Sequence, residues 1–259
     1  MSLPDILEFR KRVEAIPNLD KRIAFQTTHL ICGRIGEIIT KKYPSDKTAN
    51  PTGNKLTVEK TTYQPDLNDP QERDTWTFIK LLQGQLINFA EIAQIKEEVA
   101  VFKVATEKRG GYTREIGLPL NPKYDPWVKQ VYEYLSQKRQ RGYQYTRQQM
   151  WVTAKEVFTG LKYTIHPYKR AVMENGEYQY DEKDKLLKIQ VKERKKAFTD
   201  QAIRHLRNLE LKKFYGLTAE ERAGYGGWTL ATVAGTSAAQ DRYEEAPWRI
   251  YFPKLLKQR

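Results

Sequence analysis

The stretch VAVFKVATEKRGGYTREIGL, residues 99–118, decides how we expect this chain to fold. Two runs rich in β-branched and aromatic residues flank a short segment that contains Gly110-Gly111. Such runs on either side of a glycine turn are typical of a β-hairpin. We therefore expect two antiparallel strands, with Lys108 and Arg109 at the tip between them.

Helical spacing of apolar residues dominates the sequence around this hairpin. Apolar positions recur every three or four residues over 4–16 and over 20–42, where the second helix stops before Tyr43-Pro44. Asp69-Pro70 starts a helix that should run to about Ala93, with Asp69 as the cap and Glu72 reaching back to it. We expect this helix to bury Phe78, Ile79, Leu82, Leu86 and Phe89. Other helix starts are predicted at Asp125-Pro126, Thr146, Thr199-Asp200 and Thr218.

These elements predict a mixed α/β fold, mainly α, with a small antiparallel β-sheet and helical or hairpin insertions. We expect a single domain over 1–259. Within it we expect an N-terminal helix over 1–19, an insertion over 43–97 with a strand at 55–62, a hairpin or arm over 170–197, and a C-terminal tail over 244–259.

Composition narrows the classes of function. The 259 residues include 45 Lys and Arg against 32 Asp and Glu, a formal net charge of +13. This surplus favours a polyanionic partner, which is DNA, RNA or an anionic membrane surface. No apolar run approaches the roughly 18 residues that span a bilayer, so we expect no membrane partner. The lone Cys32 excludes a disulfide framework, and three histidines argue against a metal enzyme. We expect the protein in the cytoplasm or nucleoid, or in the host cytoplasm if a virus or mobile element encodes it.

Two arginines stand out as candidate anion ligands. Arg34 follows Gly33 inside an otherwise apolar helical stretch, and a buried guanidinium is costly unless an anion meets it. Phosphate is such an anion, and arginine matches it with two hydrogen bonds. A surface arginine paired with Glu37 is the alternative interpretation. Arg204 and His205 are adjacent on a predicted helix, where a basic solvent-facing surface is the alternative.

Taken in order, these motifs resemble those of the tyrosine recombinases, the phage-type integrases. Gly33-Arg34-x-x-Glu37 resembles the first arginine box, and Ala202-Ile203-Arg204-His205 resembles the second. Glu107-Lys108-Arg109-Gly110, followed by Arg114, resembles the hairpin that carries the catalytic lysine. Gly227-Trp228 resembles the position of the second His or Trp, and Arg242-Tyr243 resembles the nucleophile box. The resemblance covers residues 20–256, and the tail from Trp248 is similar to archaeal or archaeal-virus members.

The resemblance implies a tyrosine-recombinase-like catalytic domain that cuts and rejoins DNA at specific sites. Tyr243 would attack a backbone phosphorus and form a covalent phosphotyrosine, while Arg34 and Arg204 hold the non-bridging oxygens and Lys108 protonates the leaving oxygen. Trp228 would pack against the segment of the nucleophile, and Glu37 would orient the first box. The implied partners are double-stranded DNA and further copies of the chain, as a dimer or tetramer on DNA. No cofactor is implied, neither metal nor ATP, because the phosphotyrosine bond keeps the energy of the broken linkage.

The sequence departs from the family pattern at several places. Gln201 stands where the family has a histidine, and His205 lies one residue past the arginine. An amide can donate a hydrogen bond to phosphate but cannot shuttle a proton. The interval from Trp228 to Tyr243 is longer than usual, which leaves Tyr225 and Tyr251 as competing nucleophiles. We also expect no separate N-terminal DNA-clamping domain.

The basic tracts complete the prediction. Residues expected to contact the DNA backbone are Arg109, Lys192, Arg194, Lys195, Lys196 and Arg207, with a further tract at 138–141. A type IB-like topoisomerase or a telomere resolvase would use the same chemistry with different products. A non-catalytic DNA-binding protein, a degenerate integrase, is the alternative from another class. No pattern of the common RNA-binding modules is visible.

Overall fold

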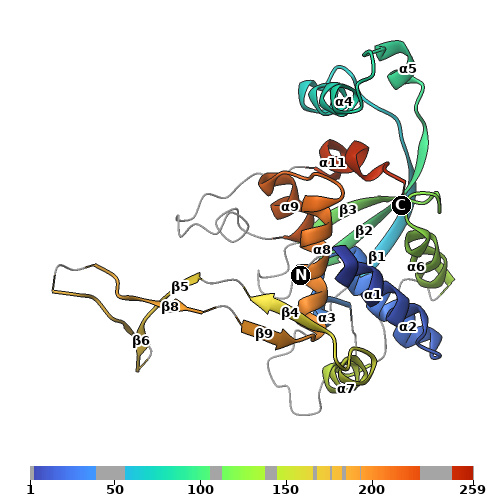
Figure 1. Cartoon of the computed structure of the whole chain (residues 1–259). Coiled ribbons are helices and arrows are strands. Elements are labelled where there is room, and N and C mark those ends of the chain that lie inside the picture. The colour runs from blue at the N-terminus through green and yellow to red at the C-terminus, as the bar shows by residue number, and fades with distance from the viewer. Residues whose placement is uncertain are drawn as a thin grey trace.

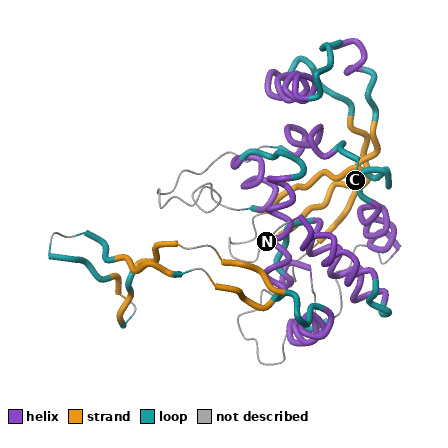
Figure 2. The backbone as a smooth tube through the Cα atoms, viewed as in Figure 1, coloured by secondary structure: helices purple, strands orange, loops and turns teal. Residues whose placement is uncertain are grey.

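The computed structural model describes residues 3–38, 56–105, 113–137, 145–165, 168–175, 177–182, 185–192, 194–227 and 247–258. It is a mixed α/β structure in which a small antiparallel sheet is packed between helices (Figures 1 and 2). No helix in these ranges is long and apolar enough to cross a bilayer.

The centre of the molecule is a three-stranded sheet of order β1-β2-β3, with β1 Leu56–Tyr63, β2 Glu97–Ala105 and β3 Thr113–Pro119. Both pairings are antiparallel, and the β2–β3 register runs from Val99 opposite Pro119 to Ala105 opposite Thr113. The expected hairpin is therefore present. Its tip, with Lys108 and Arg109, lies outside the described residues. β1 is an edge strand of the same sheet, so the excursion between β1 and β2 covers residues 64–96.

The sheet is covered on both faces, because side chains along β2 alternate between two apolar clusters. Ala100, Phe102 and Val104 join the main core, which also takes side chains from α1 Leu3–Glu14, α2 Leu19–Leu30, α6 Pro126–Gln137 and α8 Asp200–Lys213. Val99 and Val101 face a second cluster with Trp76 and Phe252. These two side chains come from α4 Pro70–Leu82 and α11 Trp248–Leu255.

The expected continuous helix over 20–42 is wrong. The helix α2 ends at Leu30, and Cys32 adopts a positive φ of 51°, after which a short helix α3 covers Ile35–Ile38. The amides of Cys32 and Gly33 donate to carbonyls of the last turn of α2, His29 and Thr28. A chain that turns back on its helix in this way cannot continue it. Residues 39–42 lie outside the described ranges.

The expected single helix over 69–93 is also wrong. It is two helices, α4 and α5 Phe89–Ala93, and between them Gly84 has a φ of 65°. Asp69 caps α4 by accepting from the Gln71 amide, but the Glu72 side chain is buried beside Arg249 instead of returning to the cap.

Most of the apolar side chains that we expected this excursion to bury are exposed. We expected burial of Phe78, Leu82, Leu86 and Phe89, yet all four are exposed, Leu86 to 96%. The helix α11 packs on the face of α4 that carries Glu72 and Trp76, so the opposite face meets solvent. In Figure 1, α4 and α5 stand away from the sheet, beyond α11.

The remaining helices begin where the sequence signals them. α7 Arg147–Val157 and α9 Ala219–Gly226 both start with a complete capping box, in which Thr146 pairs with Gln149 and Thr218 with Glu221. Between α7 and α8 the chain forms a long arm that extends from the body (Figure 1). The arm consists of β4 Lys162–Ile165, β5 Tyr168–Ala171, β6 Met173–Glu174, β7 Glu177–Tyr178, β8 Lys188–Val191 and β9 Arg194–Ala197.

Candidate functional site

Three arginines from distant parts of the chain converge on the carboxylate of Glu37. Arg34 lies just before α3, Arg114 is the second residue of β3, and Arg204 lies in the second turn of α8. The turn at Cys32 brings Arg34 and Glu37 to the end of α2, where α8 and β3 also meet. We call these four residues the arginine cluster.

The ion pairs in the cluster are close, and the carboxylate is fully buried. Arg34 Nη1 lies 3.3 Å from Glu37 Oε1, and Arg114 Nη2 lies 3.1 Å from Glu37 Oε2. Arg204 Nη1 lies 3.9 Å from Glu37 Oε1. Three guanidinium groups against one carboxylate leave a surplus of positive charge. A buried surplus of this kind favours binding of an anion.

The three arginines differ in their access to solvent. Arg34 has a side chain 37% exposed, and it is the group through which a ligand can reach the cluster. The Arg204 side chain is 9% exposed, and its Nη2 donates to the Gly226 carbonyl at 2.6 Å. Arg114 is 1% exposed, and its Nε and Nη1 have no hydrogen-bond partner among the residues that the structure describes. Arg114 therefore adds positive charge behind the other two.

Burial shapes the electrostatics of the cluster. Desolvation lowers the pKa of Arg204 to about 10, a shift that the nearby cations Arg114 and Arg34 reinforce and that Glu37 opposes. Arg204 is still charged at neutral pH. Burial also raises the pKa of Cys32 to about 11, so the thiol, 3.4 Å from the Arg204 carbonyl, is protonated at neutral pH.

The structure separates the sequence-predicted residues into three groups. Arg34, Glu37 and Arg204 come together in the cluster. His205 follows Arg204 and is exposed, and partial desolvation, Arg204 and Lys196 lower the pKa of its imidazole. Outside the described residues lie Lys108, Arg109, Trp228, Tyr243 and the tract at 138–141. For Gln201 and Arg194 only the backbone is described, in α8 and β9.

Arg207 is a correction to the predicted DNA contacts. Its side chain is 1% exposed, pairs with Glu210, and donates to the Tyr225 hydroxyl at 2.9 Å. Glu210 in turn lies 3.0 Å from His29 Nε2. A guanidinium held in this buried network is part of the core and does not reach a DNA surface. The lysines Lys192, Lys195 and Lys196, by contrast, are all exposed on the arm.

Sequence reasoning gave no role to Arg114. A signal for it exists, because Arg114, Ile116 and Leu118 alternate along β3 on the buried face. An arginine in an apolar alternation is a buried charge, and a buried charge needs a partner. The sequence does not reveal that this partner is Glu37, 77 positions away.

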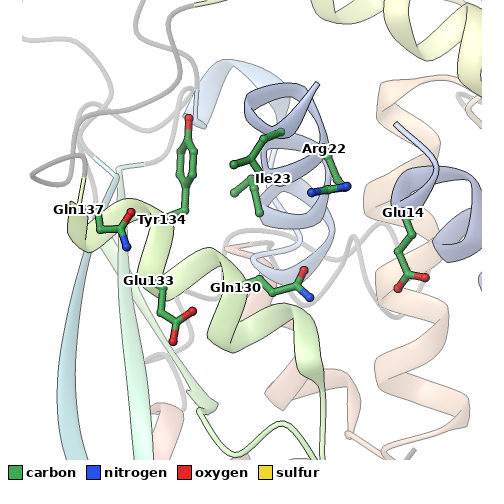
Figure 3. A pocket seen from close by; sticks show the side chains of 8 residues that line it. Glu14, Arg22, Ile23, Gln130, Glu133, Tyr134 and Gln137 are labelled. Carbon is green, nitrogen blue, oxygen red and sulfur yellow. The ribbon is translucent and has the colours of Figure 1, made fainter. Parts of the chain in front are cut away.

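A separate hollow lies between α2 and α6, lined by Arg22, Glu14 and Glu133 among others (Figure 3). Its lining mixes both signs of charge and includes none of the arginine cluster. The Tyr134 hydroxyl at its wall donates to Asp20, and Gln130 bonds to Gln26. With two acids and one base in its lining, this hollow carries no surplus of positive charge.

Comparison with protein-family models, with curated proteins and with solved structures gives no match for this chain.

Proposed function

We propose that this protein is a DNA breaking-joining enzyme with a tyrosine-recombinase-like catalytic domain, a site-specific recombinase or integrase. The observation that carries the proposal is the convergence of Arg34 and Arg204 within 3.9 Å of one oxygen of Glu37. These are the two arginines that the family resemblance assigns to a single phosphate site. Nothing in their sequence spacing, 170 positions, requires them to meet.

In this proposal the cluster holds the scissile phosphate. Arg34 and Arg204 donate to the non-bridging oxygens, and Arg114 strengthens the positive potential from behind. Donors placed where negative charge develops are worth about 10²–10³ in rate each. Glu37 keeps the guanidinium groups in position before DNA arrives, so it acts as a positioning residue.

The bond changes balance without a cofactor. The hydroxyl oxygen of Tyr243 attacks the phosphorus, the bond from phosphorus to the 5′ oxygen breaks, and Lys108 gives that oxygen a proton. The phenolic proton passes to solvent. The products are a 3′-phosphotyrosine and a 5′-hydroxyl, and attack by a 5′-hydroxyl from the same or another strand reverses the step. In this proposal Trp228 packs against the nucleophile segment, and the Gln201 amide donates a hydrogen bond to the phosphate.

Burial of the competing tyrosines supports Tyr243 as the nucleophile. The Tyr225 hydroxyl accepts from Arg207 and donates to the Leu30 carbonyl, and burial raises its pKa well above the usual value. Tyr251 is fully buried, with its ring 5.4 Å from that of Tyr225. Neither hydroxyl is available to a phosphate at the surface.

Covalent trapping tests the proposal. The protein is incubated with supercoiled plasmid and with a library of nicked duplexes, quenched with detergent, and assayed for DNA-linked protein. Wild type and Tyr178→Phe, which changes an exposed tyrosine on the arm, should give an adduct, whereas Tyr243→Phe should give none. Arg34→Lys and Arg204→Lys should lower the rate of adduct formation by about 10²–10³. Arg12→Lys, a change in α1 at an arginine that pairs with Glu8, should leave the rate unchanged.

The DNA products of the reaction distinguish the three activities that share this chemistry. Exchanged strands support a recombinase, relaxed circles a type IB-like topoisomerase, and sealed hairpins a telomere resolvase. An adduct that persists in Tyr243→Phe overturns the nucleophile. Tight, salt-sensitive binding with no adduct on any substrate favours the non-catalytic DNA-binding protein, for which Gln201 in place of histidine is the supporting observation.

A further inference from the structure

The arm is a two-stranded antiparallel ribbon with a defined root. β4 pairs with β9, and β5 pairs with β8 farther out, so the outgoing and returning strands stay together along the stem. At the root, the Phe198 amide donates to the Leu161 carbonyl at 3.0 Å. The buried Phe198 ring packs 5.1 Å from Phe158 and 5.7 Å from Phe9, which fixes the returning strand to the core. In Figures 1 and 2 the rest of the arm extends from the body.

Charge divides the arm into two parts. The returning strand of the stem carries four exposed lysines, Lys188, Lys192, Lys195 and Lys196. Beyond Val172 the arm branches into the β6–β7 hairpin and a turn closed by the Tyr180–Leu186 bridge. Against one exposed lysine, Lys185, the described side chains of these outer branches include four exposed acids, Glu174, Glu177, Asp181 and Glu182. The stem is therefore basic and the end acidic.

The basic stem begins at the arginine cluster. The returning strand β9 ends at Ala197, and α8, which carries Arg204 and His205, begins three residues later at Asp200. Lys196 also contributes to the lowered pKa of the His205 imidazole. Exposed lysines thus continue along the returning strand from the helix that carries Arg204. A single polyanion bound at the cluster meets the next positive charges on the stem.

We propose that the stem of the arm lies along duplex DNA, in its major groove, beside the phosphate held by the arginine cluster. This inference rests on the proposed function for the identity of the polyanion. The major groove of B-DNA admits a two-stranded β-ribbon. A strand rises about 3.4 Å per residue and a base pair about 3.4 Å, so the lysines from 188 to 196 span about eight base pairs. The acidic branches repel phosphates and set the outer limit of the contact.

The length of DNA that the protein occludes and the salt dependence of its DNA binding test whether the stem contacts DNA. The stem variant replaces Lys188, Lys192, Lys195 and Lys196 with Gln, and the matched tip variant replaces Glu174, Glu177 and Glu182 with Gln and Asp181 with Asn. Fluorescence anisotropy with duplexes of about 12 to 40 base pairs gives the occluded length and the slope of log K against log salt. Circular dichroism checks that both variants fold, which we expect because all the replaced side chains are exposed.

The stem variant should lose about eight base pairs of occluded length, and its salt slope should fall by about three to four, since each phosphate contact contributes about 0.9. The tip variant should occlude the same length of DNA as wild type or a longer one. Equal losses in both variants, or no loss in the stem variant, overturn the proposal. Arg204→Lys, measured in parallel, should lose adduct formation but keep the occluded length of wild type, so failure of the arm is distinguishable from failure of the catalytic proposal.

Two ligands test the groove. Duplex DNA with bulky substituents at C5 of its pyrimidines fills the major groove and should weaken binding of wild type more than of the stem variant. Double-stranded RNA has a deep, narrow major groove that a ribbon cannot enter. The length of RNA that wild type occludes should therefore match the length of DNA that the stem variant occludes. Wild type that occupies the same length on RNA as on DNA overturns the groove assignment.

Discussion

Glu37 and Arg114 form an ion pair of 3.1 Å in the interior, with side chains 0% and 1% exposed. Glu37 is the shared anion of the arginine cluster, so its charge offsets three cations at once. Its removal is therefore expected to affect stability and anion binding in opposite directions.

Glu37→Gln should lower the free energy of unfolding by about 3–5 kcal/mol, because it leaves buried guanidinium groups without a countercharge. Urea unfolding measures this loss. Glu8→Gln, which breaks the partly exposed pair between Glu8 and Arg12, is the control and should have little effect.

The same variant should respond more strongly to added anions. Sulfate should raise the unfolding midpoint of Glu37→Gln more than that of wild type, since a bound anion replaces the lost carboxylate charge. Sodium chloride at equal ionic strength is the control. An equal response of the two proteins to sulfate contradicts a binding role for the cluster.

His29 should make stability depend on pH. Burial lowers its pKa from 6.5 to about 4 against the opposing pull of Glu210, with Arg207 and Arg10 adding to the decrease. The folded-state pKa lies below the unfolded one, so the unfolded chain binds the proton first as pH falls. Stability is then full above pH 6.5 and declines by up to about 1.4 kcal/mol per pH unit between pH 6.5 and 4.

Urea unfolding of wild type and His29→Asn between pH 7.5 and 5 measures this slope. The variant should lose most of it, whereas His205→Gln, at an exposed histidine with a smaller decrease in pKa, should retain most of it. A slope that survives in His29→Asn would assign the dependence to other groups.

Gly117→Ala should loosen the last described helix. A Cβ at Gly117 would lie 2.3 Å from Cε3 of Trp248, within the indole ring that packs on β3. Overpacking of this kind costs about 1–3 kcal/mol. Thermal unfolding and limited proteolysis after residue 247 measure the effect, and Gly117→Ala with Trp248→Leu should recover part of the loss. Unchanged stability of the single variant would mean that α11 can shift without cost.

Leu86→Gln tests the outward-facing surface of the α4–α5 excursion. The side chain is 96% exposed, so the free energy of unfolding should change by no more than about 0.5 kcal/mol. Trp76→Leu, on the buried face of α4, should cost more, because the indole also donates to the Tyr63 hydroxyl at 3.0 Å. A large loss for Leu86→Gln would show that this face is covered in solution.

The parts of the fold that the sequence predicted are those that local chemistry determines. The hairpin over 99–118 combines two β-like runs with a glycine turn, and both capping boxes depend on residues three positions apart. Each signal is complete within a short segment, so these elements can be predicted without knowledge of their tertiary contacts. These elements were confirmed for that reason.

The errors arose where distant residues decide the outcome. The apolar period of α2 continues past Leu30, and nothing in the local sequence marks the positive φ of Cys32. The burial of Arg207 depends on its partner Tyr225, which comes from another helix. For the site, the resemblance supplied Arg34 and Arg204, but their meeting with Arg114 depends on tertiary structure.

The packing of Trp248 on Gly117 also has a consequence for the order of folding during synthesis. The face of β3 at Gly117 remains bare until α11 has been made, 131 residues later. At ~5–20 residues per second this interval is roughly 7–26 s. During this interval the nascent chain exposes the apolar face of β3 that α11 later covers. Chaperone occupancy of ribosome-bound chains should therefore be greatest before α11 has left the exit tunnel.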